Sequence, residues 1–161
     1  MLEVNAPTGN IFLDEGFNDL KSGNFERLKL SRMELEKRIL RRNADRGTDV
    51  GLRLDTGVKL RHGDVIKNRD TKIIVEQLPE KVISVRLKTE SRTNVMVLLG
   101  HIIGNRHRPI SIQGDEISFP IQADSEKEVF TKLFQSIISH IEMTVKEQIF
   151  FSHSGADVHE H

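Results

Sequence analysis

Several residue types are missing from this chain of 161 residues. It contains no cysteine, no tryptophan and no tyrosine. Without cysteine it can form no disulfide bond and no thiolate centre such as structural zinc or an iron–sulfur cluster. Its aromatic residues are all phenylalanine, 5% of the chain, which is less than stacking platforms for single-stranded nucleic acid normally use. Any metal must therefore bind histidine, aspartate, glutamate, backbone oxygen or water.

Long apolar runs are missing too. No run approaches the ~20 residues that a membrane-spanning helix needs. The first residues, MLEVNAPTGN, lack the basic region and apolar core of a secretory signal. With 37% hydrophobic and 30% charged residues the composition is that of a globular chain. We therefore expect a cytoplasmic protein with no membrane partner.

The formal net charge is zero, but the charges are unevenly spread. Residues 1–108 carry 21 of the 24 lysines and arginines against 15 acidic residues. Residues 109–161 carry three basic and nine acidic residues. Such an asymmetry favours docking between oppositely charged surfaces, although a solvated surface without a partner is about as compatible with it.

The first half of the chain has the pattern of short strands. Apolar and basic residues alternate in segments separated by glycine-containing turns such as DRGT and DTG. Turn signals every 8–12 residues predict a small antiparallel β sandwich or barrel. The segment SRMELEKR predicts a short helical turn within it, and Pro79 in LPEK marks the boundary. We therefore predict an all-β domain over residues 1–78. The predicted strands are GNIFLDE, ERLKLS, KRILRRNA, DVGLRL, KLRHGDVI and TKIIVEQ.

After Pro79 the periodicity changes. KVISVRLK alternates like a strand, and SRTNVMVLLGHII predicts a helix capped by Ser91 or Thr93. Two short strands around Gly114 predict a hairpin. DSEKEVFTKLFQSIISHI predicts an amphipathic helix capped by Asp124 or Ser125, and EMTVKEQIFF predicts a last strand.

The resulting β-α-β-β-α-β order predicts a ferredoxin-like domain over residues 79–150, so the fold class is α+β. Residues 151–161 contain almost nothing apolar to bury, and we expect a flexible tail there.

Two of the seven histidines, His101 and His107, lie six residues apart. On a helix they would point away from each other, whereas a chelating pair needs the i, i+4 spacing. Gly104 and Asn105 are typical of a helix C-terminus with a left-handed residue, which puts His107 just beyond the helix on the surface. His62 in RHGD is expected to face solvent in a loop, and His140 to complement a helix dipole.

The tail offers three more imidazoles, His153, His159 and His161. One fixed histidine per chain holds a metal poorly, but a two-fold axis would bring two copies of the same histidine together. Tail residues or water would complete such an open site. It suits carrying and releasing a metal better than catalysis, and imidazole suits nickel, zinc, copper and iron.

At this point the chain resembles the UreE family of urease accessory proteins. GHIIGNRHRP is similar to the family's Gly-Asn-x-His segment, RLDTGVKLRHGDVI to its sequence near the end of the first domain, and VFTKLF with the histidine-bearing tail to its ending. The resemblance covers nearly the whole chain. ISFPIQADSEK contains no histidine where some members carry a histidine-rich stretch, so no second internal site is expected.

The resemblance implies a homodimeric nickel metallochaperone that is not an enzyme. Its first domain would bind peptide or partner surfaces, and His107 would meet its twin at the dimer interface. Ni(II) is the expected cargo, with Zn(II) or Cu(II) as competitors, and His153, His159 and His161 are the expected additional ligands. Delivery would go to apo-urease, together with the urease accessory GTPase.

Two other function classes stay open on the residues alone. A ferredoxin-like sheet with a basic first half could form a metal-sensing or nucleic-acid-binding module, although no aromatic RNA-binding strand supports it and we expect no nucleic-acid partner. A metal-dependent hydrolase would need several ligands and a carboxylate base, and the sequence has no such motif.

Overall fold

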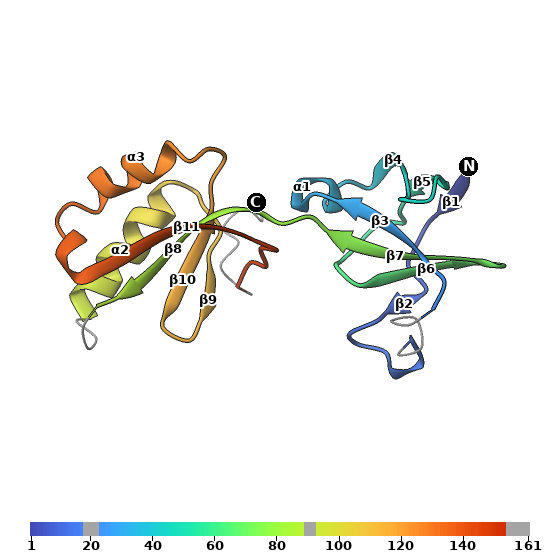
Figure 1. Ribbon diagram of the computed structural model, residues 1–161, viewed down its shortest axis with the longest axis horizontal. Coiled ribbons are helices and arrows are strands. Elements are labelled where there is room, and N and C mark those ends of the chain that lie inside the picture. The colour runs from blue at the N-terminus through green and yellow to red at the C-terminus, as the bar shows by residue number, and fades with distance from the viewer. Residues whose placement is uncertain (18–22, 89–92, 154–161) are drawn as a thin grey trace. The chain divides into compact units, whose positions relative to one another are not determined.

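The chain folds as two units, Met1–Leu78 and Pro79–His161 (Figure 1). The computed structural model describes residues 1–17, 23–88 and 93–153. Strands dominate both units, and the longer helices lie in the second. The chain is therefore an α+β protein, as the sequence predicts.

The first unit is built from two sheets. Its strands are β1 (Leu2–Val4), β2 (Gly9–Asn10), β3 (Glu26–Leu30), β4 (Ile39–Asn43), β5 (Asp49–Arg53), β6 (Asp64–Asn68) and β7 (Thr71–Gln77). One sheet has the order β1-β5-β4 and the other β2-β6-β7-β3. Alternating side chains of both sheets form one buried core that includes Leu28, Val50 and Val75.

The predicted antiparallel arrangement is only partly correct. Hairpins such as β4–β5 and β6–β7 are antiparallel, but β1 pairs with β5 and β3 pairs with β7 in parallel. Both parallel pairs join strands that are distant in the chain, so no tight turn dictates their direction. The expected strand GNIFLDE shrinks to the two residues of β2.

A short helix, α1 (Arg32–Leu35), follows β3 as predicted. Ser31 caps it: its hydroxyl accepts from the Glu34 backbone N–H, and the Glu34 carboxylate accepts from the Ser31 N–H. This reciprocal capping box satisfies two donors that a helix end leaves free. The Ser31 N–H lowers the pKa of Glu34 below its usual value, helped by Arg42.

The second unit carries two helices on a four-stranded sheet. Its elements are β8 (Glu80–Leu87), α2 (Thr93–Asn105), β9 (Ser111–Gln113), β10 (Glu116–Pro120), α3 (Glu126–Leu133), the 3₁₀ turn Ile138–His140 and β11 (Ile141–Gln148). The sheet order is β11-β8-β10-β9, with every neighbouring pair antiparallel. Gly114, at a φ of 61°, turns the predicted hairpin between β9 and β10.

Both helices pack on the same face of this sheet. α2 buries Val95, Leu99 and Ile103 against Ile83, Val85 and Phe119 of the strands, and α3 adds Phe130 to the same core. The three α2 residues recur every four positions, which is the spacing of one helix face. Among the described residues, no helix has the length and apolar character needed to cross a bilayer.

The second helix is shorter than the sequence predicts. It ends at Leu133, and Phe134, Ile137 and Ile141 then continue through tight turns to β11. The Ile137 N–H bonds to the Phe134 carbonyl and the His140 N–H to the Ile137 carbonyl, three residues back rather than four. Side chains at i+3 and i+4 face the same side, so the apolar pattern fits either geometry. Ser125 occupies the N-cap position, but its side chain makes no capping bond.

Candidate metal centre

The end of α2 places His107 on the surface of the second unit. The Arg106 N–H bonds to the Ile103 carbonyl, and the His107 N–H bonds to the Gly104 carbonyl at 2.9 Å. These turns close the helix directly after Asn105. The His107 side chain is exposed, as predicted.

The left-handed residue of this turn is His107 itself, with a φ of 53°. The sequence pattern assigned that conformation to Gly104 or Asn105, and this was wrong because both lie inside α2. A side chain in the left-handed region costs roughly 1–2 kcal/mol, although histidine occurs there more often than most residues. A histidine thus occupies a position that glycine would fill with less strain.

Arg108, the residue after His107, ties the loop to two other elements. Its Nη1 donates to the carbonyl of Pro120 at the end of β10, at 3.0 Å. Its Nη2 pairs with the carboxylate of Glu126 at the start of α3. The guanidinium also lies over the buried ring of Phe130, 6.0 Å from its centroid. One side chain therefore ties the His107 loop to β10 and α3.

Glu126 completes this arrangement. Its second oxygen accepts hydrogen bonds from the backbone N–H groups of Gln122 and Ala123. Burial alone would raise the pKa of Glu126, but the N–H of Gln122, the charge of Arg108 and the N–H of Ala123 together lower it below the usual value. The carboxylate is therefore the favoured form, so the charge of Arg108 is balanced.

The segment after β11 runs back to the same loop. Phe150 is buried, with 1% of its surface exposed. The His153 N–H then donates to the Ile110 carbonyl at 2.7 Å, three residues beyond His107. The His153 side chain is exposed. The structure thus attaches the beginning of the tail next to the His107 loop, whereas His159 and His161 lie outside the described residues.

The described part of one chain contains no cluster of three or more His, Asp or Glu side chains that could hold a metal. His101 lies in α2 with its Nε2 3.1 Å from the Asn105 amide nitrogen, so it has a local partner. His140 belongs to the 3₁₀ turn before β11 rather than to a helix end. A complete metal site at His107 therefore needs ligands from the tail or from another molecule.

His62 differs from its predicted solvent-facing loop position. It is only partly exposed, its Nδ1 accepts from the Gln77 N–H at 3.0 Å, and Phe12 stacks on its ring. The neighbouring Gly63 has a φ of 85°, and a side chain there would collide with the Phe12 ring. His62 thus has a structural role in the first unit.

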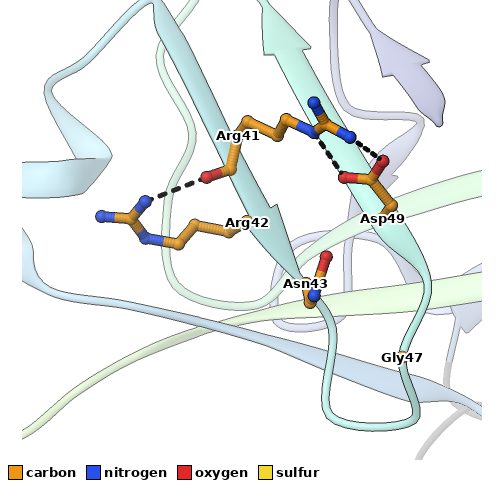
Figure 2. A pocket seen from close by; sticks show the side chains of 5 residues that line it. All are labelled: Arg41, Arg42, Asn43, Gly47 and Asp49. Atoms are coloured by element: carbon orange, nitrogen blue, oxygen red, sulfur yellow. Dashed lines mark hydrogen bonds and ion pairs between the residues drawn. The ribbon is translucent and has the colours of Figure 1, made fainter.

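A shallow polar hollow of about 570 Å³ lies at the β4–β5 hairpin. Figure 2 shows the residues that line it, Arg41, Arg42, Asn43, Gly47 and Asp49. Arg41 donates to both oxygens of Asp49, at 2.9 and 2.7 Å. This hydrogen bonding lowers the pKa of the Asp49 carboxyl group. The one carboxylate that lines the hollow is therefore already paired with a cation, so the hollow is a poor site for a metal ion.

The outward face of α2 exposes apolar and small residues. Met96, Val97 and Leu98 are 44%, 64% and 41% exposed. Gly100 and Gly104 also lie on the surface, and among the described residues no other side chain or element lies within 4 Å of where a Cβ would stand at either position. Small residues four apart let another backbone approach a helix closely. The face ends three residues before His107.

The sequence predicts His107 and His153 as candidate ligands, but it does not predict the contact between Arg108 and Glu126. The arginine that follows the histidine and the acidic residue in the first turn of the next helix are both visible in the sequence. Their separation of 18 residues gives no sign of contact.

Comparisons with known proteins point to one family. The family model described as "UreE urease accessory protein, N-terminal domain" matches residues 9–77. The protein named "Urease accessory protein UreE" from Lysinibacillus sphaericus is 34% identical to this chain, over 68% of this chain and 70% of the relative. The protein of the same name from Actinomyces naeslundii is also 34% identical, over 73% of this chain and 71% of the relative.

A relative of the same name in Haemophilus influenzae is 33% identical over 70% of this chain. The matched region spans 60% of that relative's length. The family model and the relatives agree with each other and with the resemblance of the Gly-Asn-x-His segment. The chain belongs to the UreE family of urease accessory proteins.

Proposed function

We propose that this chain is a nickel metallochaperone of urease maturation. A homodimer binds Ni(II) between the two copies of His107 and delivers it to apo-urease, in the cytoplasm and without catalysing a reaction itself. The observation that carries this proposal is the His107 loop: an exposed imidazole, in a strained left-handed conformation, on a segment held in place by Arg108. Strain that persists in a well-supported loop is typical of functional sites.

A dimer supplies what one chain lacks. The described part of the chain offers no cluster of three ligands, whereas a two-fold axis doubles every ligand near it. The apolar face of α2, with Val97 exposed at its centre and Gly100 and Gly104 open beside it, is a suitable contact surface. It ends three residues before His107, so a two-fold axis near the C-terminal end of this face brings the two imidazoles toward each other.

The tail supplies further ligands. His153 is tied by its backbone to Ile110, so the tail starts beside the loop of His107. His159 and His161 follow six and eight residues later, which gives a reach of about 20 and 27 Å for an extended chain. In this proposal either histidine reaches the site. Together His107, His153, His159 and His161 provide the imidazole set that nickel favours, for which Zn(II) and Cu(II) compete.

The two units have different roles in this proposal. The second is ferredoxin-like, which its strand order and its two helices on one face support, and it holds the metal. The first binds partners, among them apo-urease and the urease accessory GTPase.

Calorimetry and ultracentrifugation test the proposal together. The expected stoichiometry is one tight Ni(II) per two chains, lost in His107→Ala while the dimer persists. Val97→Glu places a charge on the α2 face and should give monomers with weak nickel binding. Val129→Glu on α3, also an exposed valine, is the matched control and should leave both properties unchanged. Unchanged nickel affinity in His107→Ala would refute the proposed site.

A further inference from the structure

The side chains around the His107 loop give the neighbouring residue Arg108 a role in the proposed metal site. The charge of an arginine directly beside a cation site opposes metal binding unless it is neutralised. Arg108 is such a residue, and its side chain is turned away from solvent, with 25% of its surface exposed. The contacts that hold it therefore decide both where the loop lies and what charge the site experiences.

We infer that Arg108 and Glu126 form a positioning pair for the metal ligand His107, an inference that rests on the proposed nickel site. Arg108 anchors the loop to the Pro120 carbonyl on β10 and to Glu126 on α3. Glu126 in turn is held by the N–H groups of Gln122 and Ala123. Neither side chain touches the metal.

The geometry of arginine is needed for this role. A planar guanidinium presents several N–H donors in fixed directions, so it can serve a carbonyl and a carboxylate at once. It also lies over the Phe130 ring, which is 2% exposed and part of the core. Through these three contacts the rigidity of the core reaches the residue that follows His107. The turn bonds at the end of α2 hold the preceding side.

Arg106 provides the matched control. It flanks His107 on the other side and is exposed. In the described part of the chain its side chain takes part in none of the hydrogen bonds or ion pairs that hold the loop. Replacing Arg106 removes a positive charge next to His107 without removing an anchor, whereas replacing Arg108 removes both.

The test compares Arg108→Met with Arg106→Met in the full-length protein, using nickel calorimetry and NMR relaxation of the His107 amide. Arg108→Met should weaken nickel binding about tenfold, as expected when a supporting residue of a metal ligand is lost. The order parameter of the His107 amide should fall from about 0.85 toward 0.6. Arg106→Met should leave the order parameter unchanged and should not weaken nickel binding.

Repeating the comparison in a His107→Ala background separates positioning from general stability. Arg108→Met should then leave the residual nickel affinity unchanged, because the ligand it positions is gone. Glu126→Gln, which keeps an oxygen but loses the charge, should weaken nickel binding in the wild-type background, and more strongly at low salt. If Arg108→Met unfolds the protein, the same measurements are made on Arg108→Lys. The nickel affinity of that variant should lie between the affinities of the wild type and of His107→Ala.

The two hypotheses fail in different ways. A loss of nickel affinity in His107→Ala without any loss in Arg108→Met would overturn the positioning role and leave the site intact. An equal loss from Arg108→Met in both backgrounds would also overturn it. Unchanged affinity in His107→Ala would overturn the nickel site and the inference together.

Discussion

The left-handed backbone of His107 leads to a prediction about two variants that both lack the imidazole. At a φ of 53° a residue with a Cβ is strained by roughly 1–2 kcal/mol, and glycine is not. Glycine loses about 0.4–1 kcal/mol through the greater freedom of its unfolded chain. His107→Gly should therefore be more stable than His107→Ala by about 1 kcal/mol. Contacts of the imidazole cancel in this comparison, because neither variant has one.

Amide hydrogen exchange measures this difference in the unit concerned. Ile83 and Val85 lie in β8 between β10 and β11, so their amides report the unfolding of the second unit. Leu28 and Val75 lie in the first unit and serve as an internal reference. The expected difference corresponds to about fivefold slower exchange at Ile83 and Val85 in His107→Gly, with no change at the reference amides. Both variants should lose nickel binding equally. Equal or faster exchange in His107→Gly would show that the loop does not hold residue 107 in a left-handed conformation.

Three further predictions concern other parts of the molecule. Burial raises the pKa of Asp64 in spite of hydrogen bonds from Asn10 and Arg61, so the folded state keeps this proton to a higher pH than the unfolded chain does. The stability of the first unit should therefore fall as the pH rises above the ordinary value of 3.8. Asp64→Asn should flatten this dependence when denaturation is measured at a series of pH values. Ser31→Ala should cost the first unit about 1 kcal/mol in urea unfolding, because it removes the side-chain cap of α1; an unchanged midpoint would contradict the role of the capping box. Deleting residues 154–161 should weaken nickel binding without changing the melting temperature of the second unit. Phe150→Ala, in contrast, should lower the stability of that unit by about 3–5 kcal/mol. A larger loss of stability from the deletion than from Phe150→Ala, measured by calorimetry, would contradict the burial of Phe150.

The strands and helices were largely predictable where local patterns decide them. Alternation in ERLKLS and TKIIVEQ matches β3 and β7, and the spacing of Val95, Leu99 and Ile103 matches α2. What periodicity could not predict depends on partners distant in the chain. The parallel pairing of β1 with β5 depends on which strands meet. The early end of α3 is another case, because the turns after it present Phe134 and Ile137 to the core as a longer helix would, so the apolar pattern is the same for both.

The candidate site shows the same division. His107 could be placed beyond a helix end from glycine and asparagine in the preceding turn, and its exposure followed. Its left-handed backbone could not be predicted, because the choice between Asn105 and His107 depends on where α2 makes its last hydrogen bonds. The link from His153 to Ile110 and the contacts of Arg108 join segments 43 and 18 residues apart, and such distances leave no local signal.

Diffraction from crystals grown with nickel, recorded at the nickel absorption edge, tests the central claim most directly. The account predicts an anomalous peak on a two-fold axis between two chains, within bonding distance of both His107 imidazoles, with tail histidines or water completing the coordination. A tight nickel ion bound wholly within one chain, or one coordinated without His107, would contradict it.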